Sequence, residues 1–284
     1  REVLGTEDDP ESVISQQLSY WTSELAGLPE EISLPADRPR PHVASFAGAE
    51  VGFGIDADLG GRIEELGRRL NATPFMVVHA ALAVAMSRLS GMDDIAIGTP
   101  VAGRGERELD DMVGMFVNTL VLRTGVDGGE SFADLLARTR GTDLGAFGNA
   151  DVPFERLVEI IDPARSQARN PLFQVMLAFQ NFEQTRFAIS GLTVEGVENP
   201  TDTAKFDLLV TLGANPEGAG YGGSLVYATD LFDEATVVGF GQRLVRVLDA
   251  VTADPGVAVG DVELLTPAER ALVVSEWNAT DVGA

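Results

Sequence analysis

The segment TPFMVVHAALAVAMSRLSG, residues 73–91, restricts the fold of this chain more than any other segment. Thr73 suits an N-cap, Pro74 suits the first helical position and Gly91 follows the last apolar residue, so the segment predicts a helix. The helix is apolar nearly all round, and such a helix is stable in water only when other elements cover every side. The chain is therefore predicted to build a layered core around it.

Strands are predicted to supply one of these layers. VGMFVNTLVLR at 113–123 and PLFQVMLAFQN at 171–181 carry apolar residues on both faces, which is typical of buried, central strands. FDLLVTLGA and GSLVYATDLF predict a hairpin. Apolar residues at helical spacing near 57–70 and 234–251 predict helices. The fold class is predicted as α/β, an α+β sandwich with a mixed central sheet flanked by helices.

Charge and composition exclude several classes of function. The chain has 44 acidic and 20 basic residues, a formal net charge of −24, which repels both nucleic acid and an anionic membrane surface. It has no cysteine, so it offers neither disulfides nor thiolate metal ligands. No run of 18 apolar residues and no signal-peptide pattern is present. We expect a cytoplasmic protein that binds neither nucleic acid nor membrane.

Catalytic motifs are mostly missing from the sequence. There is no phosphate-binding loop, no GxSxG and no HExxH, and only His42 and His79 are available as histidines. We interpret His42 as a solvated loop residue and His79 as a core histidine bonded to a backbone carbonyl. The adjacent carboxylates Asp110-Asp111 and Glu30-Glu31 are expected to be solvated surface groups. The sequence thus predicts no catalytic residue and no metal site.

Polar side chains inside the predicted strands raise a different possibility. Asn118 lies within an apolar strand, Gln174 and Gln180 share one face of another, and Thr99 lies near the end of DDIAIGTPV. A buried amide without partners costs roughly 2 to 7 kcal/mol, so each amide must be hydrogen-bonded. The residues alone leave two readings open, structural hydrogen bonding in a core or the lining of a channel that contains solvent.

Six segments in a fixed order give the chain a specific resemblance. It resembles the C-terminal half of a nonribosomal peptide synthetase condensation domain, whose lobes are similar to chloramphenicol acetyltransferase. The segments are QQLSYWTSELAGLPEEISLPADRPRP, ATPFMVVHAALAVAMSRLSGMDDIAIGTPVAGR, MVGMFVNTLVLR, NADVPFERLVEIIDPARSQARNPLFQVMLAFQN, TAKFDLLVTL and LVYATDLFDEAT.

The resemblance implies roles for particular residues. The expected lining of a substrate tunnel between two lobes comprises Thr99, Asn118, Gln180 and Asn181. The remaining motif residues are expected to be mainly structural, with Arg169 anchoring a carboxylate; they are Pro153, Phe154, Glu155, Arg169, Asn170, Pro171 and Leu172. Residues 1–265 would form the C-terminal lobe, 182–204 would cross over to an N-terminal lobe, and 266–284 would lead toward an adenylation domain.

The resemblance also implies an activity and its partners. The family transfers an acyl or peptidyl group from one carrier-bound thioester to the amine of another, and its signature HHxxxDG lies in the N-terminal lobe. This sequence has no HHxxxDG, so we expect a C-terminal lobe that is inactive alone. Expected partners are the N-terminal lobe, donor and acceptor peptidyl carrier proteins and an adenylation domain. No cofactor is expected to be bound, because carrier proteins deliver the phosphopantetheine arms.

Three alternatives remain beside this interpretation. An epimerization domain shares the fold, but TPVAGR together with FVNTLVLR argues against it. A heterocyclisation domain would be distinguished by a motif in the other lobe. A noncatalytic module that recruits carrier proteins or tailoring enzymes belongs to a different functional class, and the intact tunnel motifs disfavour it.

Overall fold

The computed structural model describes residues 4–103, 112–180, 201–215 and 220–279. Within them the chain forms one six-stranded sheet in the order β1-β6-β5-β4-β2-β3. β4 runs parallel to β2 and β5, and the other neighbours are antiparallel, which confirms the predicted mixed sheet and the predicted hairpin β5–β6. The strands are β1 Gly48–Ile55, β2 Asp94–Val101, β3 Asn118–Gly125, β4 Val175–Gln180, β5 Leu208–Ala214 and β6 Tyr221–Ala228.

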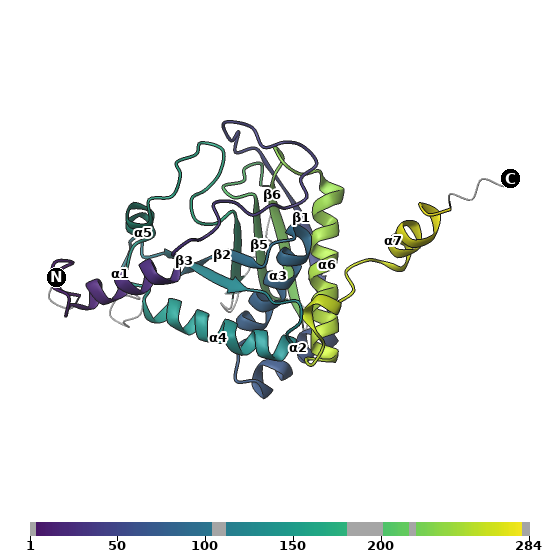
Figure 1. The fold of residues 1–284 in the computed structure, drawn as a ribbon, viewed down its shortest axis with the longest axis horizontal. Coiled ribbons are helices and arrows are strands. Elements are labelled where there is room, and N and C mark those ends of the chain that lie inside the picture. The colour runs from purple at the N-terminus through teal and green to yellow at the C-terminus, as the bar shows by residue number, and fades with distance from the viewer. Residues whose placement is uncertain (1–3, 104–111, 181–200, 216–219, 280–284) are drawn as a thin grey trace, which may run out of the picture.

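Helices cover the two faces of the sheet unequally. On one face α2, α3 and α6 pack together (Figure 1). On this face α6 lies over β1 and α4 lies beside β3. On the other face α1 packs with α5 near β3. The first face buries the larger apolar cluster. The helices are α1 Val13–Glu24, α2 Ala57–Arg69, α3 Pro74–Ser90, α4 Phe132–Gly148, α5 Phe154–Ile161, α6 Glu234–Ala253 and α7 Pro267–Ala271, followed by the π-helical turn η3 Leu272–Glu276; η2 Val259–Asp261 is a 3-10 turn.

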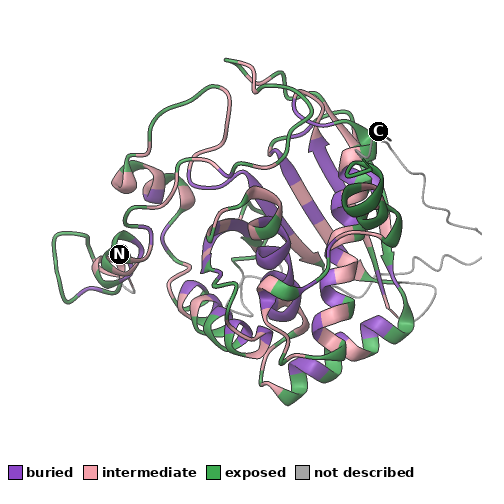
Figure 2. Cartoon of the chain, turned by 45° about the vertical axis from the view of Figure 1, so that its right-hand side comes forward, coloured by how far each residue is buried: buried purple, intermediate pink, exposed green. Residues whose placement is uncertain are grey.

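Helix α3 is the centre of the fold, as its sequence predicts. The Thr73 hydroxyl accepts a hydrogen bond from the Met76 amide at 3.3 Å, and Gly91 ends the helix in the left-handed region at φ 71°. Every residue from Met76 to Met86 is buried, including His79, and the helix lies inside its neighbours (Figure 2). Its uniform apolarity is therefore explained by cover on all sides.

The predicted central strand at 113–123 is wrong in two respects. The strand begins only at Asn118, and within the described part of the chain it forms the edge of the sheet and pairs only with β2. Its residues from Leu120 to Leu122 are nevertheless buried, because α1 and α5 pack beside this edge. The apolar residues on both faces of β3 are therefore covered by helices. They do not show that β3 has a neighbouring strand on each side.

Smaller boundaries also differ from the sequence predictions. β4 begins at Val175, four residues after the predicted start, because the segment 169–172 adopts a turn with Leu172 at φ 67°. Pro153 is the N-cap of α5, directly before its first residue Phe154. Thr99 and Pro100 both lie within β2.

The last helix begins at Thr266 as N-cap, with Pro267 at the first helical position. The Thr266 hydroxyl accepts from the Glu269 amide and the Glu269 carboxylate accepts from the Thr266 amide, at 2.9 and 2.7 Å. Arg243 of α6 holds the same carboxylate at 2.7 Å, while the segment beyond it stands away from the body (Figure 1). Among the described helices no single one is long and apolar enough to cross a membrane.

The tyrosines give a testable pH dependence. Burial first, and then nearby acids, raise the pKa of Tyr20 and of Tyr221 to about 12, and the pKa of Tyr227 is raised by the same causes. Because the folded state holds these protons more tightly, their contribution to stability is present below about pH 10 and is lost as pH rises toward 12. In an ultraviolet titration the folded chain should form tyrosinate later than the chain in denaturant. Coincident curves would contradict this expectation.

Candidate functional site

Three of the four predicted tunnel residues lie at the same end of the sheet. Thr99 is near the carboxyl end of β2, Gln180 ends the parallel strand β4, and Asn118 begins β3 opposite Val101 of β2. Their order in the sheet is β4-β2-β3, so adjacent strands present them together. Asn181, the fourth, lies outside the described residues, as does most of the predicted crossover at 182–204.

The Asn118 amide is hydrogen-bonded entirely to backbone. Its Nδ2 donates to the carbonyls of Ala150 and Val152, each at 2.9 Å. Its Oδ1 accepts from the amides of Thr119 at 2.8 Å and Phe154 at 3.1 Å. Two donors and two acceptor positions are thereby occupied, which is the full capacity of an amide. Asn118 joins the start of β3 to the start of α5, and its side chain keeps no free hydrogen-bonding position.

Thr99 and Gln180 differ in how far solvent reaches them. Thr99 is 2% exposed, and its hydroxyl donates to the Leu177 carbonyl at 2.9 Å across β2 and β4. Gln180 is exposed at the end of β4, beside Gly213 of β5. Of the three residues, Gln180 is the one with a side-chain amide open to a ligand.

An exposed apolar run precedes this end of the sheet. Val113 is fully exposed and Met115 is 90% exposed, and Met112 and Val117 are also exposed. Exposure of four large apolar side chains in six residues is unusual for a monomer surface and is typical of a surface that another protein covers. The residues predicted as the first half of a buried strand therefore form an uncovered apolar segment.

The residues around the start of α5 serve mainly to position it. Pro153 caps the helix, and the Phe154 ring packs edge-on against Phe173 with centroids 5.6 Å apart. Glu155 is exposed in the first turn, where a carboxylate is favoured by the helix dipole. All three residues of the Pro-Phe-Glu motif thus lie at the start of α5.

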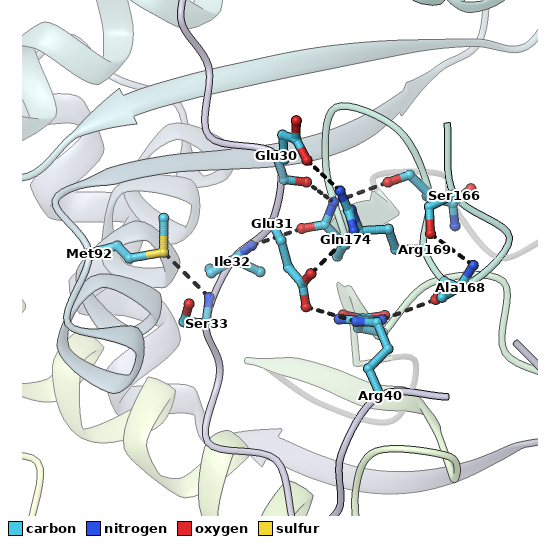
Figure 3. Close-up of polar contacts among 12 residues, drawn as sticks. Glu30, Glu31, Ile32, Ser33, Arg40, Met92, Ser166, Ala168, Arg169 and Gln174 are labelled. Carbon is cyan, nitrogen blue, oxygen red and sulfur yellow. Dashed lines mark hydrogen bonds and ion pairs between the residues drawn. The ribbon is translucent and has the colours of Figure 1, made fainter. Parts of the chain in front are cut away.

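The motif at 169–172 forms a turn held by ion pairs and hydrogen bonds (Figure 3). Arg169 contacts Glu30 at 2.7 Å and Glu31 at 3.5 Å, so it does anchor carboxylates. Asn170 donates to the backbone carbonyl of Lys205, and Leu172 is buried. Glu30 is exposed, as expected, whereas Glu31 is only partly exposed, and both carboxylates are paired with arginines. The other predicted carboxylate pair, at 110–111, lies outside the described residues.

Residue Arg40 completes this network, and sequence reasoning missed it. Its guanidinium contacts Glu31 at 2.8 Å (Figure 3). It also binds Asp207 through two nitrogens. Burial raises the pKa of Asp207 although the arginine partly opposes it, and the bond to Asp207 raises the pKa of Arg40. The two residues are 167 positions apart, so no local pattern connects them.

Of the two readings that the sequence leaves open for Gln174, the structure shows hydrogen bonding within the core. Its Oε1 accepts from the Ile32 amide at 2.9 Å, and its Nε2 donates to the carbonyls of Asn170 at 3.0 Å and Glu30 at 3.3 Å (Figure 3). The amide therefore ties the segment at 30–32 to the turn before β4.

His79 was predicted to bond a backbone carbonyl, and this is wrong. Its Nδ1 lies 2.9 Å from a carboxylate oxygen of Asp143, with both side chains completely buried. The ring N–H is not aligned for a good hydrogen bond, and both Asp143 oxygens have no other partner among the described residues. Thr124 lies 3.5 Å from Nε2. This pair lies between α3 and α4, within the core.

Comparison with known proteins gives one family. The model of the Condensation domain matches residues 8–274. A protein of Salinispora arenicola described as the nonribosomal peptide synthetase CymA is 48% identical over 99% of this chain, and the dimodular nonribosomal peptide synthase of Bacillus subtilis is 41% identical over 98%. The chain spans only 4% and 12% of the length of these two relatives.

Solved structures agree with the predicted fold. The X-domain in its complex with OxyB from teicoplanin biosynthesis superposes with a TM-score of 0.85 and 30% identity, covering 93% of this chain and 58% of that chain. A four-domain nonribosomal peptide synthetase, AB3403, gives a TM-score of 0.79 at 23% identity over 92% of this chain and 21% of that chain. The mixed sheet flanked by helices is thus the one found in these structures.

Proposed function

Because this chain belongs to the condensation-domain family of nonribosomal peptide synthetases, we propose that it is the C-terminal lobe of such a domain and supplies one wall of its substrate tunnel. Domains of this family form peptide bonds. The reaction assigned to the complete domain is attack of an acceptor amine on a carrier-bound donor thioester, with the C–N bond forming, the C–S bond breaking and the thiol leaving. The expected setting is the cytoplasm.

The exposed apolar segment at 112–117 is the observation that carries this proposal. It lies next to the sheet end that presents Thr99, Asn118 and Gln180, so a partner lobe that covers it also covers that end. The solved X-domain chain, of which this chain covers 58%, supports a second lobe of similar size. The tunnel then runs between the two surfaces.

The chemistry divides between the two lobes. Aminolysis of a thioester gains most from holding amine and carbonyl in line, and a base then takes the amine proton. Thr99, Asn118 and Gln180 do not titrate near neutral pH, so they suit a wall that orients substrate. Gln180 is the residue proposed to contact substrate, while Asn118 holds the wall in shape. The base is assigned to the HHxxxDG motif of the partner lobe, and carrier proteins bring both phosphopantetheine arms.

A reconstitution assay tests the proposal. Carrier proteins loaded with donor and acceptor aminoacyl groups are mixed with this chain alone, with a separately produced N-terminal lobe, and with both, and the acceptor carrier is analysed by mass spectrometry. We expect the dipeptidyl carrier only when both lobes are present. A matched N-terminal lobe with alanine in place of the second histidine of HHxxxDG is the control. Dipeptide formation by this chain alone would refute the division of roles.

The X-domain match favours a second candidate function, a noncatalytic protein-binding module. The X-domain in that structure is in complex with OxyB, and its identity of 30% to this chain is higher than that of AB3403. In the same assay this candidate predicts no dipeptide in any mixture, and stable binding of a tailoring enzyme in gel filtration. Formation of the dipeptidyl carrier in the mixture that contains both lobes would exclude this noncatalytic function.

A further inference from the structure

A pocket lies at the opposite end of the sheet from Thr99 and Gln180. Its volume is about 260 Å³, and its walls come from the segments at 40–46, 166–171, 204–207 and 228–231. The first three segments directly precede β1, β4 and β5, and the fourth follows β6. Because β6 runs antiparallel to β1 and β5, all four segments lie at the end of the sheet where β4 and β5 begin. The pocket is therefore separate from the proposed tunnel wall.

The walls of this pocket are fixed before any ligand arrives. Arg40 and Asp207 bind each other through two hydrogen bonds, and Asn170 donates to the Lys205 carbonyl. The Ala44 amide donates to the Gln167 carbonyl at 2.9 Å, which ties two of the wall segments together. A site whose groups are already held in place loses little conformational entropy on binding.

Two charges on the pocket wall remain without an opposite partner. Lys205, the sole lysine of the sequence, is exposed, and its side chain makes no hydrogen bond or ion pair with any described residue. Asp230 accepts from the Ser45 amide at 2.7 Å and hydroxyl at 2.8 Å, and no cation lies beside it in the described part of the chain. Lys205 and Asp230 thus line the same pocket as two unpaired opposite charges, while the charge of Arg40 is already paired with Asp207 and Glu31.

Apolar side chains supply the rest of the lining. Phe206 and Leu231 lie in the wall, and Phe46 is 57% exposed at φ 59°. Positive φ is a strained conformation for a phenylalanine, and here it is held because the Ala204 amide donates to the Phe46 carbonyl at 2.9 Å. In this conformation the Phe46 side chain is exposed and lines the pocket.

We propose that this pocket binds a free α-amino acid with an apolar side chain, its carboxylate paired with Lys205, its ammonium with Asp230 and its side chain against Phe46. A simple organic anion or amine would meet one attractive and one repulsive charge, whereas a zwitterion satisfies both. The volume is appropriate for one amino acid, not for a peptide. A ligand bound here does not reach the tunnel wall, so it acts as an effector and not as the substrate.

The single lysine makes a direct test available. Reductive methylation with carbon-13 formaldehyde gives one dimethyl-lysine signal in the NMR spectrum, and the separate α-amino signal serves as internal reference. The probes are L-phenylalanine, hydrocinnamate, which has only the carboxylate, and phenethylamine, which has only the ammonium. We expect the Lys205 signal to shift saturably with phenylalanine, with half-saturation below about 1 mM, and at least about tenfold more weakly with the other two probes.

Variants then separate the site from a general charge effect. Asp230→Asn keeps an acceptor for Ser45 and should weaken phenylalanine binding about tenfold or more, whereas Asp261→Asn, a remote exposed change, should leave it unchanged. Lys205→Met should abolish binding measured by calorimetry. Equal thermal midpoints show that each variant is folded. A linear, unsaturable shift, equal responses to all three probes, or unchanged binding in Asp230→Asn would overturn the proposal.

Discussion

Replacing His79 by alanine is expected to lower the free energy of unfolding by about 3 to 5 kcal/mol. The substitution leaves the Asp143 carboxylate completely buried with no other partner among the described residues, and it also removes a ring that stacks on Phe75 at 6.0 Å. Asp143→Ala should cost a similar amount because His79 is then the group left unpaired. Urea unfolding followed by circular dichroism measures both values.

The double variant tests whether His79 and Asp143 stabilise the fold as an interacting pair or independently of each other. If His79 and Asp143 stabilise the core together, the variant with both alanines should be destabilised by clearly less than the sum of the two single changes, with a coupling energy above about 1 kcal/mol. His42→Ala, in an exposed loop, is the matched control and should change stability by less than about 0.5 kcal/mol. Simple additivity would show that the 2.9 Å contact contributes nothing.

Replacing Asn118 by alanine is expected to cost about 3 to 4 kcal/mol of stability. It removes four hydrogen bonds, each contributing about 1 kcal/mol net, and leaves the carbonyls of Ala150 and Val152 without their donor. Because the start of α5 is tied to β3 through this amide, hydrogen exchange should rise in both elements. His42→Ala, in an exposed loop, again serves as the control and is expected to change stability by less than about 0.5 kcal/mol.

An isosteric change gives the more decisive result for Asn118. Asn118→Asp keeps the acceptor for Thr119 and Phe154 but places a second oxygen against two carbonyls. We expect it to be at least as destabilising as alanine at neutral pH and to recover part of the loss in acid, where the carboxyl becomes a donor. Full stability of Asn118→Asp would mean that the amide does not hold the two segments together.

Local patterns predicted most of the helices because the residues that determine them lie close together in the sequence. Thr73, Pro74 and Gly91 mark the ends of α3, and Thr266 with Pro267 marks the start of α7. Apolar runs also identified the strands, but not where they lie in the sheet. The apolar run 113–123 was misread because burial by helices and burial by strands give the same pattern.

The sequence by itself determined the fold class, the central buried helix and the family resemblance, since these depend on spacing and on motif order. Only the tertiary structure decided what each buried polar group bonds. Asn118 meets backbone at 150–154, His79 meets Asp143, and Arg40 meets Asp207. These partners come from segments that are distant in the sequence and meet only when the chain packs. A hydrogen bond also depends on distances to within tenths of an ångström, which a pattern of residue types does not determine. The same packing brings Lys205 and Asp230 to one pocket.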